Sequence, residues 1–187
     1  PRCPDLAEVF MVELLLILAA AAAAAAALAG LGYLLVWFLL HGRRDGPGWE
    51  KLEGFRYAHR GLHGPGVPEN SLAAFRRAAE AGYGAELDVH LTRDGRLVVI
   101  HDGDLERMCG VPGRVAEKTA EELAALRLAG SEEHIPLLEE VLPLFAGRAP
   151  LVVELKAERG NADALAAAAC RLLDKYRVTY CIESFDP

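Results

Sequence analysis

Two carboxylates stand two positions apart, Glu86 and Asp88, within a run of mainly apolar residues between Ala85 and Leu91. In an extended strand the side chains of residues i and i+2 point to the same face, so these two acids lie side by side. Paired carboxylates repel each other unless one is protonated or a cation lies between them. Hard divalent cations prefer oxygen ligands of this kind. The spacing therefore predicts a strand that presents a cation-binding pair.

Three further apolar runs end in ionisable side chains. These side chains are His59 and Arg60, then His101, and finally Glu154 with Lys156 on one strand face. In a parallel (β/α) barrel the carboxyl ends of all strands meet at one face, which is where active sites lie. The pattern therefore predicts that four strands deliver these residues to a single site.

Six motifs, taken in chain order, resemble those of the glycerophosphodiester phosphodiesterase family. They are His59-Arg60-Gly61, Pro68-Glu69-Asn70-Ser71, Glu86-Leu87-Asp88, Asp94-Gly95, Val98-Val99-Ile100-His101-Asp102 and Glu154-Leu155-Lys156. Each motif is short and unspecific alone, but six in the same order make a specific signal. The resemblance covers about residues 55–187. It implies a TIM barrel, the (β/α)8 fold, and an enzyme that hydrolyses phosphodiesters.

The resemblance also implies a metal site. Glu86, Asp88 and Glu154 look like the family's ligands for Mg²⁺ or Ca²⁺, with water and the substrate phosphate completing the shell. Arg60 and Lys156 would neutralise the phosphate, the first through a forked guanidinium and the second as a point charge. The structural alternative is that these two cations only pair with the three carboxylates.

His59 and His101 resemble the general acid and general base of the family. Imidazole titrates near neutral pH, so one ring can accept a proton while the other protonates the leaving alkoxide. The sequence leaves open which histidine has which role, and a strand-end histidine often serves only as a hydrogen-bonded structural residue. Glu69 and Asn70 are expected to brace a loop and cap a helix, whereas His90 shares the strand face of the acids.

The expected activity is metal-dependent hydrolysis of glycerophosphodiesters to sn-glycerol 3-phosphate and an alcohol. The attacking hydroxyl is either water or the substrate's own glycerol hydroxyl. A first alternative is a lysophospholipase D-type enzyme on the same barrel, acting at the membrane. A second alternative belongs to another class, namely a membrane-anchored protein that binds phosphodiesters without turning them over.

Strand-like and helix-like runs alternate through this region, which favours a parallel sheet. Strands are predicted over 55–58, 85–91, 97–100, 151–155 and 178–182, and helices over 72–81, 119–128, 136–145 and 162–175. A hairpin-like turn is predicted at 92–95. A complete TIM barrel needs about 250 residues. We therefore expect about the first five β/α units of the barrel, with the remaining units lying beyond the sequence given.

Residues 14–40 carry no charge and precede the catalytic region. As a helix this segment measures about 40 Å, enough to cross a hydrocarbon core of about 30 Å with some tilt. A cleaved signal peptide is the rival interpretation, but the segment is long and lacks a basic region before it. Arg43 and Arg44 follow it, so the positive-inside rule places the catalytic domain in the cytoplasm.

These patterns give the predicted domain boundaries. Residues 1–13 form an N-terminal tail, with Met11 as the expected true start, 14–40 a transmembrane helix, 41–54 a short linker and 55–187 the barrel domain. A linker of this length should keep the active face near the bilayer. The net charge of −7 argues against a nucleic-acid partner. The four cysteines lack metal-binding spacing, which favours reduced thiols over a disulfide or zinc site.

Overall fold

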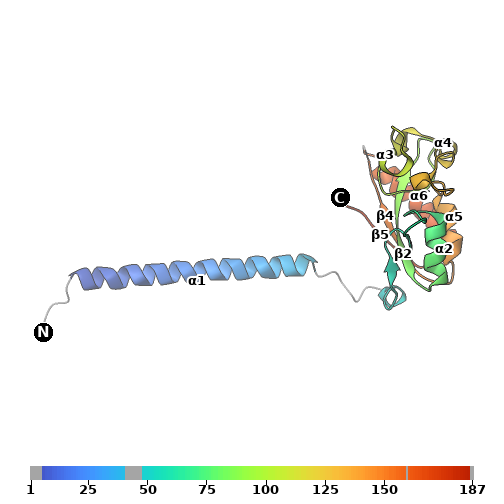
Figure 1. The fold of residues 1–187 in the computed structure, drawn as a ribbon. Helices are drawn as coiled ribbons and strands as arrows, with labels where there is room; N and C mark the ends of the chain where they lie inside the picture. The colour runs from blue at the N-terminus through green and yellow to red at the C-terminus, as the bar shows by residue number, and fades with distance from the viewer. Residues whose placement is uncertain (1–5, 41–47, 159, 186–187) are drawn as a thin grey trace. The chain divides into compact units, whose positions relative to one another are not determined.

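The computed structural model describes residues 6–40, 48–158 and 160–185, and the chain divides into two units, 1–47 and 48–187. Residues 1–5 of the predicted tail (1–13) and residues 41–47 of the predicted linker (41–54) lie outside the described residues. The second stretch includes His41, Arg43 and Arg44. The first unit contains one described helix, α1 (Leu6–Leu40), drawn in blue in Figure 1. Within it, Phe10–Leu39 is long and apolar enough to cross a membrane, with a mean hydropathy of 2.5. Length and composition alone make this helix a candidate membrane span.

The second unit is built on a sheet whose main strands run parallel. In the described residues these strands lie side by side in the order β1 (Tyr57–Ala58), β2 (Gly84–Leu91), β4 (Leu151–Leu155) and β5 (Tyr180–Glu183). The register sets Asp88 opposite Glu154 and Glu154 opposite Glu183. This parallel α/β sheet confirms the predicted fold class and aligns carboxylates from three strands in one row.

The strand predicted over 97–100 differs from the others in direction. It forms β3 (Leu97–Val99), which runs antiparallel to β2 and sets Val99 opposite Val89. Only a tight turn separates β2 from β3, and a parallel return would need a crossover of about a dozen residues or more. Four of the five strands in the described part of the chain are therefore parallel. The hairpin returns the chain to the site, where the Ile100 N–H donates to the Asp88 carbonyl at 3.1 Å.

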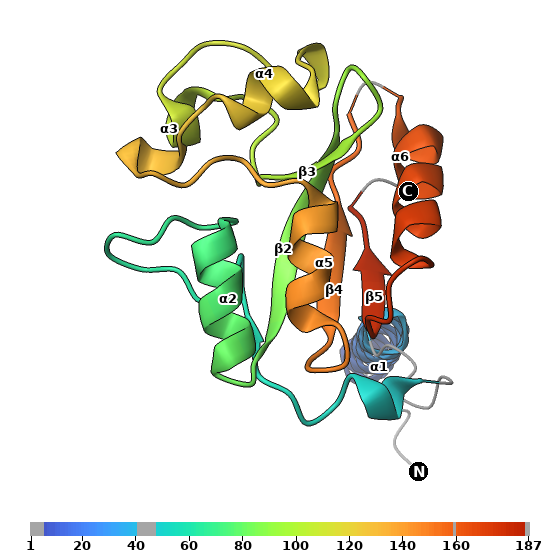
Figure 2. The same cartoon turned by 90° about the vertical axis from the view of Figure 1, so that its right-hand side faces the viewer.

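Three helices cover one face of this sheet: α2 (Leu72–Glu80), α5 (Leu138–Phe145) and α6 (Ala162–Leu173), as Figure 2 shows. Leu87 and Val89 of β2 point into this apolar core. Phe75 of α2 packs edge-to-face on Phe145 of α5, with ring centroids 6.3 Å apart. Because side chains alternate along a strand, residues 86, 88 and 90 point to the opposite face.

An insertion between β3 and α5 packs around its own apolar core. It contains α3 (Glu106–Cys109), α4 (Ala120–Ala124) and two short 3-10 turns, Val115–Glu117 and Leu128–Gly130. Outside this insertion, a third 3-10 turn at Trp49–Lys51 precedes β1. A capping box is present, since Thr119 and Glu122 cap α4 reciprocally. The helix is shorter than predicted, because Leu128 turns inward to join the core of the insertion. Figure 2 shows α3 and α4 gathered at one end of the sheet.

Candidate active site

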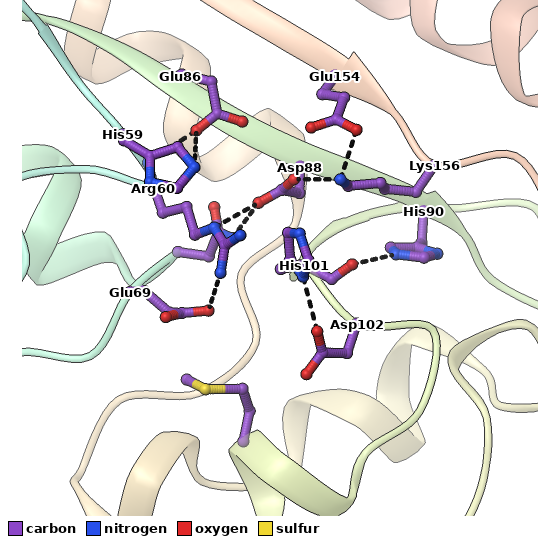
Figure 3. A network of polar contacts seen from close by, with 12 residues as sticks. His59, Arg60, Glu69, Glu86, Asp88, His90, His101, Asp102, Glu154 and Lys156 are labelled. Carbon is purple, nitrogen blue, oxygen red and sulfur yellow. Dashed lines mark hydrogen bonds and ion pairs between the residues drawn. The ribbon is translucent and has the colours of Figure 1, made fainter. Parts of the chain in front are cut away.

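Three carboxylates converge at the carboxyl end of the parallel strands. Glu86 and Asp88 of β2 and Glu154 of β4 each offer an oxygen, and these oxygens lie within 4.8 Å of one another. Figure 3 shows the three side chains directed toward one space. Burial, and then the charge of Asp88, raise the pKa of Glu86 to about 7. A divalent cation bound between these carboxylates would relieve their repulsion, and such cations prefer oxygen ligands. The three residues therefore suit the metal that the sequence predicts.

Two cations border this acidic cluster. Lys156 Nζ lies 2.5 Å from Glu154 Oε1 and 3.0 Å from Asp88 Oδ1, and Arg60 Nε lies 3.6 Å from Asp88 Oδ2. Burial alone would lower the pKa of Lys156, but the hydrogen bonds to Glu154 and Asp88 outweigh it and raise that pKa. Burial likewise favours protonation of Asp88, yet hydrogen bonds from Asn70 and Lys156 hold its pKa below the ordinary value. Both groups are therefore charged at neutral pH.

The two predicted catalytic histidines lie on either side of the cluster (Figure 3). His59 Nε2 is 3.8 Å from Glu86 Oε2, and its side chain is 70% exposed. His101 Nδ1 is 2.7 Å from Asp102 Oδ1. Because Nδ1 faces a carboxylate, we assign the proton to that nitrogen, which leaves Nε2 to exchange a proton with a substrate. The geometry thus suits acid–base chemistry at His101.

The loop after β1 is held in a strained backbone conformation. Arg60 and Asn70 have φ values of 56° and 52°, in the left-handed region that non-glycine residues seldom adopt. The strain directs donors at the acids: the Arg60 N–H donates to Glu86 Oε2 at 2.9 Å, and the Asn70 amide donates to Asp88 Oδ2 at 2.7 Å. The helix cap is Ser71, whose Oγ accepts from the Ala74 N–H. Asn70, predicted to brace the loop or cap the helix, therefore contacts the site itself.

Four charged residues near the site were not predicted to take part. Glu69 Oε1 accepts from Arg60 Nη1 at 2.9 Å and from Arg107 Nη2 at 2.7 Å, and Arg107 Nε also donates to Asp102. On β5, burial and the nearby charge of Glu154 raise the pKa of Glu183. Glu69 and Asp102 stand within two of the six motifs, whereas Glu183 lies on β5 outside them. Arg107 lies in the insertion, where no strand pattern indicates its position.

The remaining histidines in the described part of the chain are His63, His90 and His134. His90 is only 3% exposed, and its Nε2 lies 3.1 Å from the carbonyl oxygen of His101. It therefore supports the backbone of a site residue, as its strand position suggested. His63 is exposed and His134 lies 3.7 Å from Glu140, both apart from the acidic cluster.

A cavity of about 660 Å³ adjoins the cluster. Its wall includes His101, Glu154 and Lys156 from the site, and Phe185 near the end of the described chain. Pockets of this size accommodate small-molecule ligands. The site therefore has room for a substrate beside its charged groups.

The fold and site define a parallel α/β barrel segment with an acidic cluster and two histidines at its carboxyl edge. The model of the glycerophosphoryl diester phosphodiesterase family matches residues 59–177. The chain belongs to this family.

Relatives and solved structures agree with that membership. The chain is 42% identical over 111 residues to a glycerophosphodiester phosphodiesterase of Bacillus altitudinis, covering 54% of this chain and 43% of that protein. It is 31% identical over 166 residues to a lysophospholipase D of Rattus norvegicus, covering 78% of this chain and 50% of that protein. The chain thus spans half or less of the length of these two relatives.

A solved phosphodiesterase of Oleispira antarctica, in complex with the product sn-glycerol-3-phosphate, superposes with a TM-score of 0.65 at 29% identity. That match covers 71% of this chain and 57% of the solved one. A glycerophosphodiester phosphodiesterase of Thermotoga maritima matches with a TM-score of 0.60 at 32% identity, covering 72% and 55%. The described domain therefore corresponds to somewhat more than half of these barrels.

Proposed function

We propose that the protein hydrolyses glycerophosphodiesters to sn-glycerol 3-phosphate and an alcohol with the help of a divalent cation. The observation that carries this proposal is the convergence of three carboxylate oxygens within 4.8 Å, flanked by His59 and His101. The Bacillus altitudinis relative, and the Oleispira antarctica enzyme with its bound product, support the choice of substrate class.

Glu86, Asp88 and Glu154 would hold Mg²⁺ or Ca²⁺. When bound, the cation supplies positive charge that polarises a phosphoryl oxygen and lowers the pKa of the attacking hydroxyl. Arg60 and Lys156 would bind the other phosphate oxygens, and both already lie beside Asp88. Their charges stabilise the additional negative charge of the transition state.

His59 and His101 would transfer the protons. One imidazole accepts the proton of the attacking hydroxyl, and the other donates a proton to the leaving alkoxide. Asp102 fixes the ring of His101 through the contact at Nδ1, so its Nε2 would move the proton. Release of a cyclic glycerol phosphate would identify the substrate's own hydroxyl as nucleophile, and its absence during turnover would identify water.

The apolar helix would anchor the enzyme as a single-pass membrane protein with the barrel domain in the cytoplasm. The proposed boundaries are 14–40 for the span, 41–54 for the linker and 55–187 for the barrel domain. Support comes from the candidate span Phe10–Leu39 and from the arginines at 43 and 44. Carbonate extraction followed by protease protection of sealed vesicles tests this arrangement. Release by carbonate would indicate a cleaved signal, and protection of the domain inside right-side-out vesicles would support the cytoplasmic orientation.

A second candidate function is lysophospholipase D activity at the membrane. The alignment with the Rattus norvegicus lysophospholipase D covers 78% of the chain, against 54% for the Bacillus altitudinis relative. A membrane anchor would also bring the site close to lipid substrates. Turnover of lysophosphatidylcholine without turnover of glycerophosphocholine would favour this candidate.

One assay separates these functions. The full-length protein in detergent is given glycerophosphocholine, glycerophosphoethanolamine or lysophosphatidylcholine, with Mg²⁺, Ca²⁺ or EDTA, and glycerol 3-phosphate or lysophosphatidic acid is measured. Glu86→Gln should abolish metal-dependent release of product. Glu139→Gln should leave this release intact, because Glu139 lies on α5 and forms an exposed ion pair with Arg96. No product from any substrate by a folded, metal-loaded protein would favour the non-catalytic binding role.

A further inference from the structure

Arg107, in the insertion, joins the two loops that carry the catalytic groups. Its Nη2 lies 2.7 Å from Glu69 in the loop after β1, and its Nε donates to Asp102 in the segment after β3. These carboxylates in turn contact Arg60 and His101. We infer that Arg107 is a positioning residue, which sets the geometry of His101 and the charge available at Arg60. This inference rests on the proposed phosphodiesterase function.

The first contact acts on His101 through Asp102. One carboxylate oxygen of Asp102 lies 2.7 Å from His101 Nδ1, and the other accepts from Arg107 Nε. With both oxygens engaged, the carboxylate cannot rotate without breaking a charged hydrogen bond. The hydrogen bond from Arg107 holds the pKa of Asp102 at about 2, so Asp102 stays ionised as a partner for the imidazole. Arg107 thereby fixes the direction in which His101 Nε2 points.

The second contact acts on Arg60 through Glu69. Glu69 Oε1 accepts from Arg60 at 2.9 Å and from Arg107 at 2.7 Å, so two cations share one carboxylate. Without Arg107, the full charge of Glu69 would act on Arg60 alone. By sharing Glu69, Arg107 leaves part of the Arg60 charge for the substrate phosphate.

The insertion gives Arg107 a rigid base. Its neighbours Leu105 and Met108 are buried in the core of the insertion, and Arg107 Nη1 contacts Met108 Sδ at 3.1 Å. A functional side chain is held accurately when its supporting residues are locked by packing. The insertion is therefore a working part of the site and not only a connection between β3 and α5.

Replacement of Arg107 is expected to leave the domain folded. Its side chain is 46% exposed, and exposed ion pairs contribute little to stability. Arg127 offers a matched control in the same insertion, since the contacts of its guanidinium are with the carbonyl oxygens of Ala124 and Leu126. The comparison therefore uses Arg107→Ala, Arg107→Lys and Arg127→Ala in the full-length protein.

The kinetic test measures kcat and KM for the substrate that the wild type turns over. Arg107→Ala should lower kcat about 10- to 100-fold, the range that a small misplacement of a catalytic group can cost. It should also raise KM several-fold, because Arg60 binds phosphate less well. Arg107→Lys should recover much of kcat, and Arg127→Ala should stay within about twofold of wild type. Equal effects of the two alanine variants would overturn the inference, whereas an inactive wild type would contradict the proposed function instead.

A spectroscopic test holds whether or not the protein turns over substrate. The Nδ1–H proton of His101, assigned with selectively labelled histidine, should give a downfield resonance in wild type, Arg107→Lys and Arg127→Ala. In Arg107→Ala this resonance should broaden or disappear, because Asp102 is free to rotate. An unchanged resonance in that variant would show that Asp102 positions His101 without Arg107, and the inference would fail.

Discussion

Asp88 of β2 and Glu154 of β4 face each other across a parallel pair of strands, and the ammonium of Lys156 lies against both. Strand register fixes this relationship. A slip of one residue would turn Glu154 to the helix-covered face, where the apolar core lies. The packing of Val153 and Leu155 in that core therefore holds the carboxylate in the site.

Removing a carboxylate from the cluster should remove metal-dependent stabilisation. Mg²⁺ or Ca²⁺ at about 100 times its Kd should stabilise the wild-type domain by about 2.7 kcal/mol, and Asp88→Asn should lose this gain. Thermal unfolding with and without the cation measures it. Asp163→Asn, at an exposed position in the first turn of α6, should respond to the cation like wild type. A wild-type protein that neither cation stabilises would contradict the proposed ligand set.

Glu86 should make the stability of the metal-free domain depend on pH. Its pKa is raised from 4.5 to about 7 by burial and by the charge of Asp88. The folded state therefore holds a proton that the unfolded state releases between these values, and the resulting stability is lost as pH rises through this window. In EDTA the free energy of unfolding should fall from pH 4.5 to pH 7, by at most about 3 kcal/mol.

Glu86→Gln should remove most of this fall, because glutamine does not titrate. Urea denaturation at a series of pH values provides the measurement. A wild-type curve that is flat over the window, or that rises, would indicate that Glu86 is already ionised in the metal-free protein.

Asn70 should combine a stabilising hydrogen bond with a strained backbone. Its amide donates to the buried Asp88, while its φ of 52° is costly for a residue with a Cβ. Asn70→Ala loses the bond and keeps the strain, so it should cost about 2–3 kcal/mol of unfolding free energy. Asn70→Gly loses the same bond but relieves the strain, and should be the more stable of the two by about 1 kcal/mol. Chemical denaturation of both variants measures the difference, and the reverse order would refute this account.

Gly61 should not tolerate alanine. Its φ is 79°, and an added Cβ would lie 2.8 Å from the Cβ of Ala74 and 3.2 Å from the ring of Phe75. Gly61→Ala should therefore displace the loop that carries His59 and Arg60. We expect a loss of activity of about tenfold or more. Gly64→Ala, where an added Cβ meets nothing within 4 Å, is the control in the same loop.

Local patterns were sufficient to predict the strands and the acids on them. Alternation placed Glu86 and Asp88 on one face of β2, and the apolar run before Glu154 indicated β4. The convergence of Glu154 with the other two acids followed from the rule that parallel strands end at one edge. These predictions depend on properties of neighbouring residues, which a sequence displays directly.

Contacts between distant segments could not be predicted in the same way. Asn70 reaches Asp88 only because its backbone adopts a left-handed conformation. Arg107 reaches Glu69 across 38 positions of sequence, through an insertion that has no strand periodicity. In each case tertiary packing, and not local preference, determines the contact.

The β2–β3 hairpin has a consequence for how this site can change. It carries a proposed metal ligand, Asp88, and a proposed acid–base residue, His101, on one continuous hydrogen-bonded ribbon. A shift of either strand would move both groups together. Cation geometry and proton-transfer geometry are therefore mechanically linked, so a variant selected for a different cation should also need an adjustment of the acid–base pair.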